Sequence, residues 1–131
     1  MRILIAEDDL TSRIFMKKYL SMYGTCDVAI NGMEAIDMVA SALGRHEHYD
    51  LICLDIMMPK VDGIKALKAI RELEETLLVD GSKPSKVIMT TALNDKDTVD
   101  EAYKLGCQAY AWKPVDIERF DAVLRKLGLI V

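Results

Sequence analysis

Long hydrophobic runs are missing from this sequence of 131 residues. The first apolar run, residues 3–6, stops at three consecutive acids, whereas the core of a signal peptide or a membrane span requires a much longer stretch. We therefore expect a cytoplasmic protein that does not enter a membrane.

Cysteine is scarce as well. The three cysteines, Cys26, Cys53 and Cys107, lie far apart, their number is odd, and their spacing matches no zinc motif. These features argue against a disulfide framework and against a cysteine-based metal site. Free cysteines in apolar surroundings are most often buried and reduced, and we expect this for all three.

An excess of positive charge is absent too, since 17 basic residues face 21 acidic ones and the net charge is −4. This balance gives no reason to expect nucleic-acid binding, which needs a basic surface. The composition, 51% hydrophobic and 29% charged, is that of an ordinary soluble globular protein, and the length fits one domain spanning residues 1–131.

The apolar residues form short runs that alternate with segments of helical periodicity. Strands are predicted at residues 2–6, 26–30, 51–54, 87–92 and 107–112. Helices are predicted at residues 10–23, 33–43, 63–75, 94–106 and 116–127, with Asn94 as the N-cap of the fourth. This alternation predicts an α/β fold, a doubly wound five-stranded parallel sheet with helices on both faces, and we expect the flavodoxin-like strand order 2-1-3-4-5.

In this order the carboxyl ends of the first and third strands meet at one edge of the sheet, where open α/β sheets bind ligands. Glu7 and Asp8 follow the first strand, and Asp55 ends the third. Like charges about 4 Å apart repel by about 4 kcal/mol at an effective dielectric constant of about 20. We therefore expect a divalent cation, and Mg2+ suits a site with few carboxylates that leaves room for waters and phosphate oxygens.

Two further polar side chains stand at the ends of neighbouring strands. Thr91 ends the fourth strand and Lys113 follows the fifth, while Thr90 is expected to be an ordinary strand residue. Aspartate can act as a covalent phosphoryl acceptor, and a phosphoryl group in transfer needs metal, ammonium and hydroxyl groups around its oxygens. Asp55, Mg2+, Lys113 and Thr91 can fill these roles.

The order of these motifs resembles the receiver domains of two-component response regulators, of the single-domain type found in chemotaxis, over essentially the whole chain. The motifs that carry the resemblance each stand at or just after the end of a predicted strand: Glu7-Asp8, Asp55 with Met58-Pro59 and Asp62-Gly63, Thr91-Ala92, and Lys113-Pro114. The chain departs from the family pattern in a longer connection at residues 76–86 and in the apolar Trp112 and Val115 beside Lys113.

The resemblance implies a signalling switch in a phosphorelay. A histidine kinase or a phosphotransfer protein would phosphorylate Asp55 in a Mg2+-dependent reaction, and the phosphoryl group would later be hydrolysed slowly. Asp8, Asp55 and the carbonyl group of Met57 would ligate Mg2+, with Glu7 acting largely through water.

The resemblance also assigns roles around the phosphoryl group. Thr91 would bind it, Lys113 would form its ion pair, and the bond from Lys113 to Pro114 would be cis. Tyr110 matches an aromatic switch position that moves with Thr91, although a tyrosine is also a common core residue with a polar tip. A downstream protein partner would bind the surface at residues 94–127, and a homodimer is left open.

Three other functions stay open at this point. A Mg2+-dependent phosphatase with an aspartyl nucleophile would need an acid two residues after Asp55, where the chain has Met57. A receiver-like interaction module without phosphotransfer would not need the full set of acids and the lysine. An FMN-binding flavodoxin-like protein would need a loop rich in hydroxyl groups and glycine after the first strand, where this chain has acids.

Overall fold

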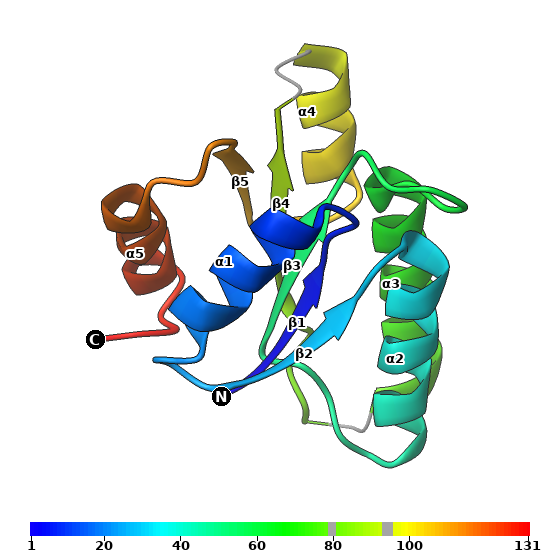
Figure 1. The fold of residues 1–131 in the computed structure, drawn as a ribbon. Helices are drawn as coiled ribbons and strands as arrows, with labels where there is room; N and C mark the ends of the chain where they lie inside the picture. Colours follow the sequence, from blue (N-terminus) through cyan, green and yellow to red (C-terminus); the bar gives the residue numbers. More distant parts are fainter. Residues whose placement is uncertain (79–80, 93–95) are drawn as a thin grey trace.

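One parallel β-sheet runs through the centre of the molecule (Figure 1). The computed structural model describes residues 1–78, 81–92 and 96–131. Within them the sheet has five strands in the order β2-β1-β3-β4-β5, which confirms the predicted order. The strands are β1 Arg2–Ala6, β2 Thr25–Ala29, β3 Leu51–Asp55, β4 Lys86–Thr91 and β5 Ala109–Trp112.

Helices cover both faces of this sheet (Figure 1). One face packs against α1, Leu10–Leu20, and α5, Ile117–Lys126. The other face packs against α2, Gly32–Gly44, and α3, Gly63–Leu77, with α4, Lys96–Lys104, next to α3. Throughout the described ranges, no helix combines the length and the apolar character that a bilayer span requires.

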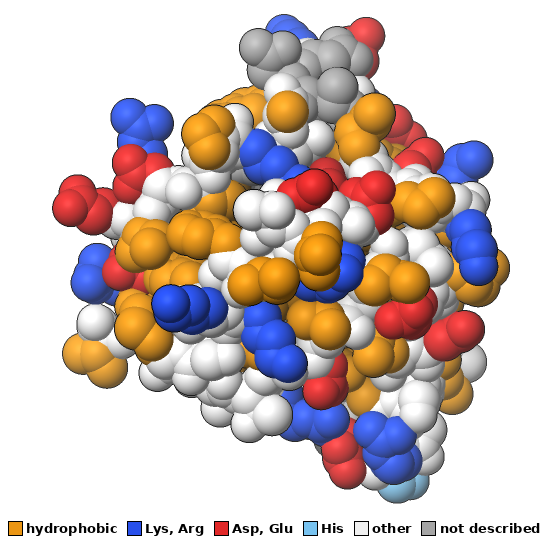
Figure 2. Space-filling view, in the orientation of Figure 1, with side chains coloured by type: hydrophobic (Ala, Val, Ile, Leu, Met, Phe, Trp, Pro, Cys, Tyr) orange, Lys and Arg blue, Asp and Glu red, His pale blue; other side chains and the backbone are white. Residues whose placement is uncertain are grey.

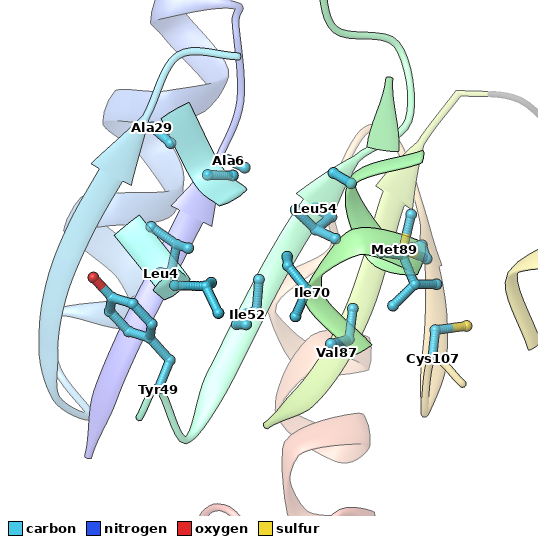
Figure 3. Packing of buried hydrophobic residues seen from close by; sticks show 14 of the residues in the cluster. Leu4, Ala6, Ala29, Tyr49, Ile52, Leu54, Ile70, Val87, Met89 and Cys107 are labelled. Atoms are coloured by element: carbon cyan, nitrogen blue, oxygen red, sulfur yellow. The ribbon is translucent and has the colours of Figure 1, made fainter. Parts of the chain in front are cut away.

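The central strand β3 is buried along its whole length, which explains its unbroken apolar run. Successive side chains point to opposite faces, so Leu51 and Cys53 pack towards α1 and α5, whereas Ile52 and Leu54 pack towards α2 and α3. Figure 3 shows the cluster of buried residues to which Ile52 and Leu54 belong, in which Ile70 of α3 lies over β3 and β4. Burying each such aliphatic side chain stabilises the fold by about 1.5–3 kcal/mol.

The three cysteines are free thiols. Cys53 and Cys107 are buried as expected, and burial raises the pKa of both thiols, that of Cys107 to about 11. Cys26 is only partly buried, because it lies on the edge strand β2.

Several elements end elsewhere than the sequence pattern indicates. α1 stops at Leu20 because residues 21–23 form a turn, in which the amide of Tyr23 donates to the carbonyl of Leu20. β5 starts only at Ala109, since the amide of Cys107 donates back to Ala102 at the end of α4. β2 and β4 each lie one residue nearer the N-terminus than predicted, and the predicted N-cap Asn94 lies outside the described residues.

The helix α1 turns an apolar stripe outward. Leu10 is 60% exposed and Ile14 59% exposed, although both fall at helical spacing with other apolar residues. The buried side of α1 instead consists of Met16, Tyr19 and Leu20. Tyr19 decides this orientation: its ring packs edge-on against Phe120 of α5, and its hydroxyl donates to Asp121. Periodicity therefore identified the helix but not the face that it buries.

A polar network fastens the amino-terminal edge of the sheet. The guanidinium of Arg71 in α3 donates to Glu74 (2.6 Å), to the carbonyl of Ser85 (2.9 Å) and to the carbonyl of Gly106 (2.6 Å). Glu74 is buried, and its other carboxylate oxygen accepts the amide of Ser85 (2.7 Å). The network joins α3 to the start of β4 and to the turn before β5, so the long connection after α3 does not displace either strand.

We expect Arg71→Met to lose about 3–5 kcal/mol of unfolding free energy, because it leaves the buried carboxylate of Glu74 without its cation. Adding Glu74→Gln should recover part of the loss, since the amide is uncharged and its oxygen can still accept the Ser85 amide. Urea denaturation of the wild type and both variants measures these differences. A single variant as stable as the wild type would contradict this account.

Candidate functional site

Acidic side chains from two neighbouring strands meet at the carboxyl edge of the sheet. β1 pairs with β3 up to Ala6 opposite Leu54, so Glu7 and Asp55 leave the paired region side by side. One carboxylate oxygen from each of Glu7, Asp8 and Asp55 lies within 4.8 Å of the others. Glu7 and Asp55 are buried, while Asp8 is exposed. The predicted acidic crevice is therefore present, and it opens to solvent at Asp8.

Lys113 reaches this crevice from the end of β5. Its ammonium group donates to Glu7 (2.6 Å) and to Asp55 (2.9 Å). Its amide donates to the carbonyl of Thr91 (2.9 Å), and the Lys113–Pro114 bond is cis, as the resemblance implies. Burial works to lower the pKa of Lys113, but the hydrogen bonds to the two carboxylates outweigh it and raise that pKa. The lysine therefore stays positively charged at neutral pH.

Glu7 has an unusual protonation equilibrium. Burial raises the pKa of Glu7 to about 7, the hydrogen bond from Lys113 opposes this rise, and the negative charge of Asp55 adds to it. Without a metal ion, the crevice therefore takes up a proton near neutral pH. A divalent cation would compete with this proton for the same oxygens.

The loop after β3 holds Asp55 in place. The amide of Met57 donates to a carboxylate oxygen of Asp55 (3.2 Å). Gly63 starts α3 directly behind this residue, since a Cβ atom on Gly63 would lie 2.3 Å from the carbonyl oxygen of Asp55. The carboxylate of Asp62 caps α3 by accepting the amide of Lys65 (2.9 Å). The Asp62-Gly63 motif thus has a structural role: Asp62 caps α3, and Gly63 allows the helix to begin in close contact with Asp55.

The acidic loop after β1 has a support that the sequence analysis missed. A guanidinium nitrogen of Arg13 in α1 donates to the carbonyl of Glu7 (2.9 Å) and to that of Asp8 (3.2 Å). The next acid, Asp9, is exposed and caps α1 by accepting the amide of Ser12 (2.9 Å). Nothing in the spacing of Arg13 distinguishes it from a surface arginine, so only the structure could reveal this contact.

Two threonines end β4 near the crevice. Thr91 is fully buried, and its strand neighbour Thr90 pairs in register with Asp55. Thr90, expected to be an ordinary strand residue, also lines a cavity of about 530 Å³ together with Glu7 and Lys113. Tyr110 of β5 is partly buried, and its ring centroid lies 4.7 Å from that of Trp112. The switch candidates Thr91 and Tyr110 thus lie on the adjacent strands β4 and β5.

Two cavities flank the crevice. The one of about 530 Å³ is bounded by α1, through Phe15 and Met16, and by residues 113–115. Another of about 710 Å³ extends from Asp8 along the loop after β3 to Thr98 and Glu101 of α4. One cavity thus reaches the crevice at Asp8, and the other reaches it at Glu7 and Lys113.

The donor set fits a hard divalent cation. Mg2+ binds through one or two carboxylates, keeps several waters and accepts phosphate oxygens, and three carboxylates within 4.8 Å supply such ligands. The adjacent ammonium of Lys113 supplies a second positive charge. Together they could hold a doubly charged phosphoryl group against a carboxylate nucleophile.

Comparison with known proteins agrees with this chemistry. Residues 3–125 match the family model of the response regulator receiver domain. The chain is 32% identical over 130 residues to sporulation initiation phosphotransferase F of Bacillus subtilis, covering 98% of the chain and 94% of that protein. It is 29% identical over 126 residues to the osmosensing histidine protein kinase SLN1 of Saccharomyces cerevisiae, covering 95% of the chain and 10% of that kinase.

The fold has close counterparts among solved structures. A chain of the CheX-CheY-BeF3-Mg2+ complex of Borrelia burgdorferi superposes with a TM-score of 0.82 at 25% identity. The match covers 98% of the present chain and 89% of that chain.

The raised pKa of Glu7 predicts a pH-dependent stability in the absence of metal. The folded chain holds this proton up to about pH 7, whereas the unfolded chain releases it near 4.5. Stability should therefore fall as the pH rises through this window. Glu7→Gln removes the titration, so its melting temperature relative to the wild type should rise by about 5 °C between pH 5 and pH 8.

Thermal unfolding in a chelating buffer measures this difference. Glu72→Gln, an exposed substitution on α3, is the matched control and should track the wild type at both pH values. A difference between Glu7→Gln and the wild type that stays constant with pH would contradict the prediction.

Proposed function

The chain belongs to the family of response regulator receiver domains, and we propose that its Asp55 accepts a phosphoryl group from a phosphohistidine of a histidine kinase or phosphotransfer protein. Receiver domains bind Mg2+ in an acidic pocket and pair with such donors. The observation that carries the proposal is the meeting of Glu7, Asp8, Asp55 and the Lys113 ammonium in one crevice.

The proposed transfer uses Asp55 as the nucleophile. A carboxylate oxygen of Asp55 forms a bond to phosphorus while the P–N bond of the phosphohistidine breaks, and the imidazole nitrogen leaves with the electron pair. Asp8, Asp55 and the carbonyl of Met57 would hold Mg2+, with Glu7 acting through water. When bound there, Mg2+ would neutralise charge on the phosphoryl oxygens.

Lys113 and Thr91 complete the proposed site. Lys113 already lies 2.9 Å from Asp55, so its ammonium can pair with a phosphoryl oxygen after a short movement. Thr91 ends the neighbouring strand, and its hydroxyl would bind another oxygen. The exposed side of the crevice at Asp8 would admit the water that later hydrolyses the acyl phosphate.

The donor would dock on α1. Apolar side chains of Leu10, Ile14 and Phe15 are exposed there, and Phe15 lines the cavity that leads to Lys113. Figure 2 shows hydrophobic side chains on the surface over α1 and α5. An amphipathic helix that carries the phosphohistidine could cover these side chains while its imidazole points into the crevice.

The output would form around the edge strand β5, on the surface at residues 94–127. Phosphorylation adds about 1.5 to 2 negative charges and strong acceptor oxygens, which would draw the hydroxyl of Thr91 towards Asp55. Tyr110 could then turn inward, and this would change the surface at residues 94–127, of which residues 94 and 95 lie outside the described part of the chain. A downstream protein, or a second copy of the chain in a homodimer, would bind that surface.

Replacing the nucleophile tests the proposal. Asp55→Asn keeps the shape of the side chain but removes the attacking oxygen, so incubation with Mg2+ and acetyl phosphate should no longer add a phosphoryl group in intact mass spectra. Asp9→Asn, a change at the exposed cap of α1, should be modified like the wild type. Undiminished modification of Asp55→Asn would contradict the assignment.

Removing a proposed metal ligand should weaken Mg2+ binding. We expect Asp8→Asn to lower the affinity about tenfold or more in calorimetric titrations. The same variant should melt at a higher temperature in chelating buffer, because a repelling charge is gone. Asp9→Asn again serves as the control, since asparagine also caps helices. Equal Mg2+ affinities would mean that Asp8 is not a metal ligand.

A further inference from the structure

The strand β5 lies at the edge of the sheet (Figure 1), and it carries two aromatic side chains that contact each other. Tyr110 and Trp112 occupy alternate positions of the strand, and their ring centroids are 4.7 Å apart with 51° between the ring planes. Tyr110 packs against the core cluster beneath α2 and α3, whereas Trp112 is 46% exposed. The rings therefore form a pair with an inner and an outer member.

This pair lies beside the buried Thr91. In the register of β4 and β5, Thr91 is opposite Trp112, and Met89 is opposite Tyr110. Side chains of opposite residues in paired strands stand on the same face of the sheet. The amide of Lys113, next to Trp112, also donates to the carbonyl of Thr91 (2.9 Å). A movement of Thr91 is therefore transmitted to Trp112 as directly as to Tyr110.

Packing of the core does not account for Trp112. Among the described residues it belongs to neither of the two core clusters. Together with Tyr110 it instead forms one wall of a groove of about 410 Å³ that reaches Arg119 and Phe120 of α5. The position of the two rings thus determines the shape of a surface groove.

We propose that Trp112 is a positioning residue of the switch, an inference that rests on the proposed phosphorylation of Asp55. The ring of Tyr110 contacts Trp112 in a tilted arrangement, and an inward turn beside Thr91 would break this contact. Trp112 holds Tyr110 in this tilted contact and so opposes the inward turn that follows phosphorylation. Contacts between aromatic rings shift an equilibrium by about two- to tenfold.

Beryllofluoride, which mimics a phosphoryl group on aspartate, is the probe for this equilibrium. With saturating Mg2+, binding is followed by the fluorine NMR signals of the bound group. Trp112→Leu keeps an apolar side chain but removes the ring, and it should bind the probe about two- to tenfold more tightly than the wild type. Trp112→Phe keeps an aromatic ring, so its affinity for beryllofluoride should be close to that of the wild type.

Repeating the substitution in the Tyr110→Leu variant distinguishes an effect of Trp112 on Tyr110 from a general structural effect of Trp112. In Tyr110→Leu there is no ring for Trp112 to hold, so adding Trp112→Leu should leave the affinity unchanged. A merely structural contribution of Trp112 would persist in this background. The chain has a single tryptophan, so its fluorescence emission reports on Trp112 alone and should change when the wild type binds beryllofluoride.

The outcomes distinguish this inference from the proposed function. If no bound fluorine signal forms in the wild type, or if it persists in Asp55→Asn, the proposed phosphorylation fails and the inference fails with it. If the probe binds but Trp112→Leu has wild-type or weaker affinity, only the role of Trp112 is overturned. Failure of Trp112→Phe to restore the affinity, or an effect that survives in Tyr110→Leu, overturns that role as well.

Discussion

The structure depends on how three carboxylates are held in one crevice. At separations of about 4 Å each pair repels by about 4 kcal/mol at an effective dielectric constant of about 20, and burial of Glu7 and Asp55 adds a desolvation cost. Lys113 offsets part of both costs by donating to Glu7 and Asp55 at once. Without a metal ion, a proton on the buried Glu7 balances part of the remaining charge. In the proposed function, Mg2+ would balance it instead.

The strand order is the reason why this arrangement can be predicted from the sequence. Glu7, Asp55 and Lys113 are far apart along the chain, but each one ends or follows a short apolar run. In a parallel sheet such ends share an edge, so the order β2-β1-β3-β4-β5 was enough to predict that these side chains meet. The loop chemistry was also local: Asp62 caps α3, and Gly63 leaves room for the carbonyl of Asp55.

Contacts between side chains of distant elements could not be predicted in this way. The apolar spacing of α1 indicated a helix, but the aromatic contact of Tyr19 with Phe120 decides which face is buried. Arg71 looks like a surface arginine in the sequence, yet it donates to the backbone carbonyl of Gly106, which only the fold brings near. Helix and strand ends shifted for a different reason, since local backbone hydrogen bonds in turns, such as that from Cys107 to Ala102, override the apolar pattern.

Lys113 makes two contacts that matter for the proposed switch. Its side chain binds Asp55, while its amide binds the carbonyl of Thr91, so a new charge on Asp55 acts on the end of β4 and on the end of β5 together. At the other edge of the sheet, Arg71 ties the turn before β5 to α3. In the proposed switch, a movement that starts at the crevice would therefore be confined to the carboxyl ends of β4 and β5, where Tyr110 contacts the exposed Trp112.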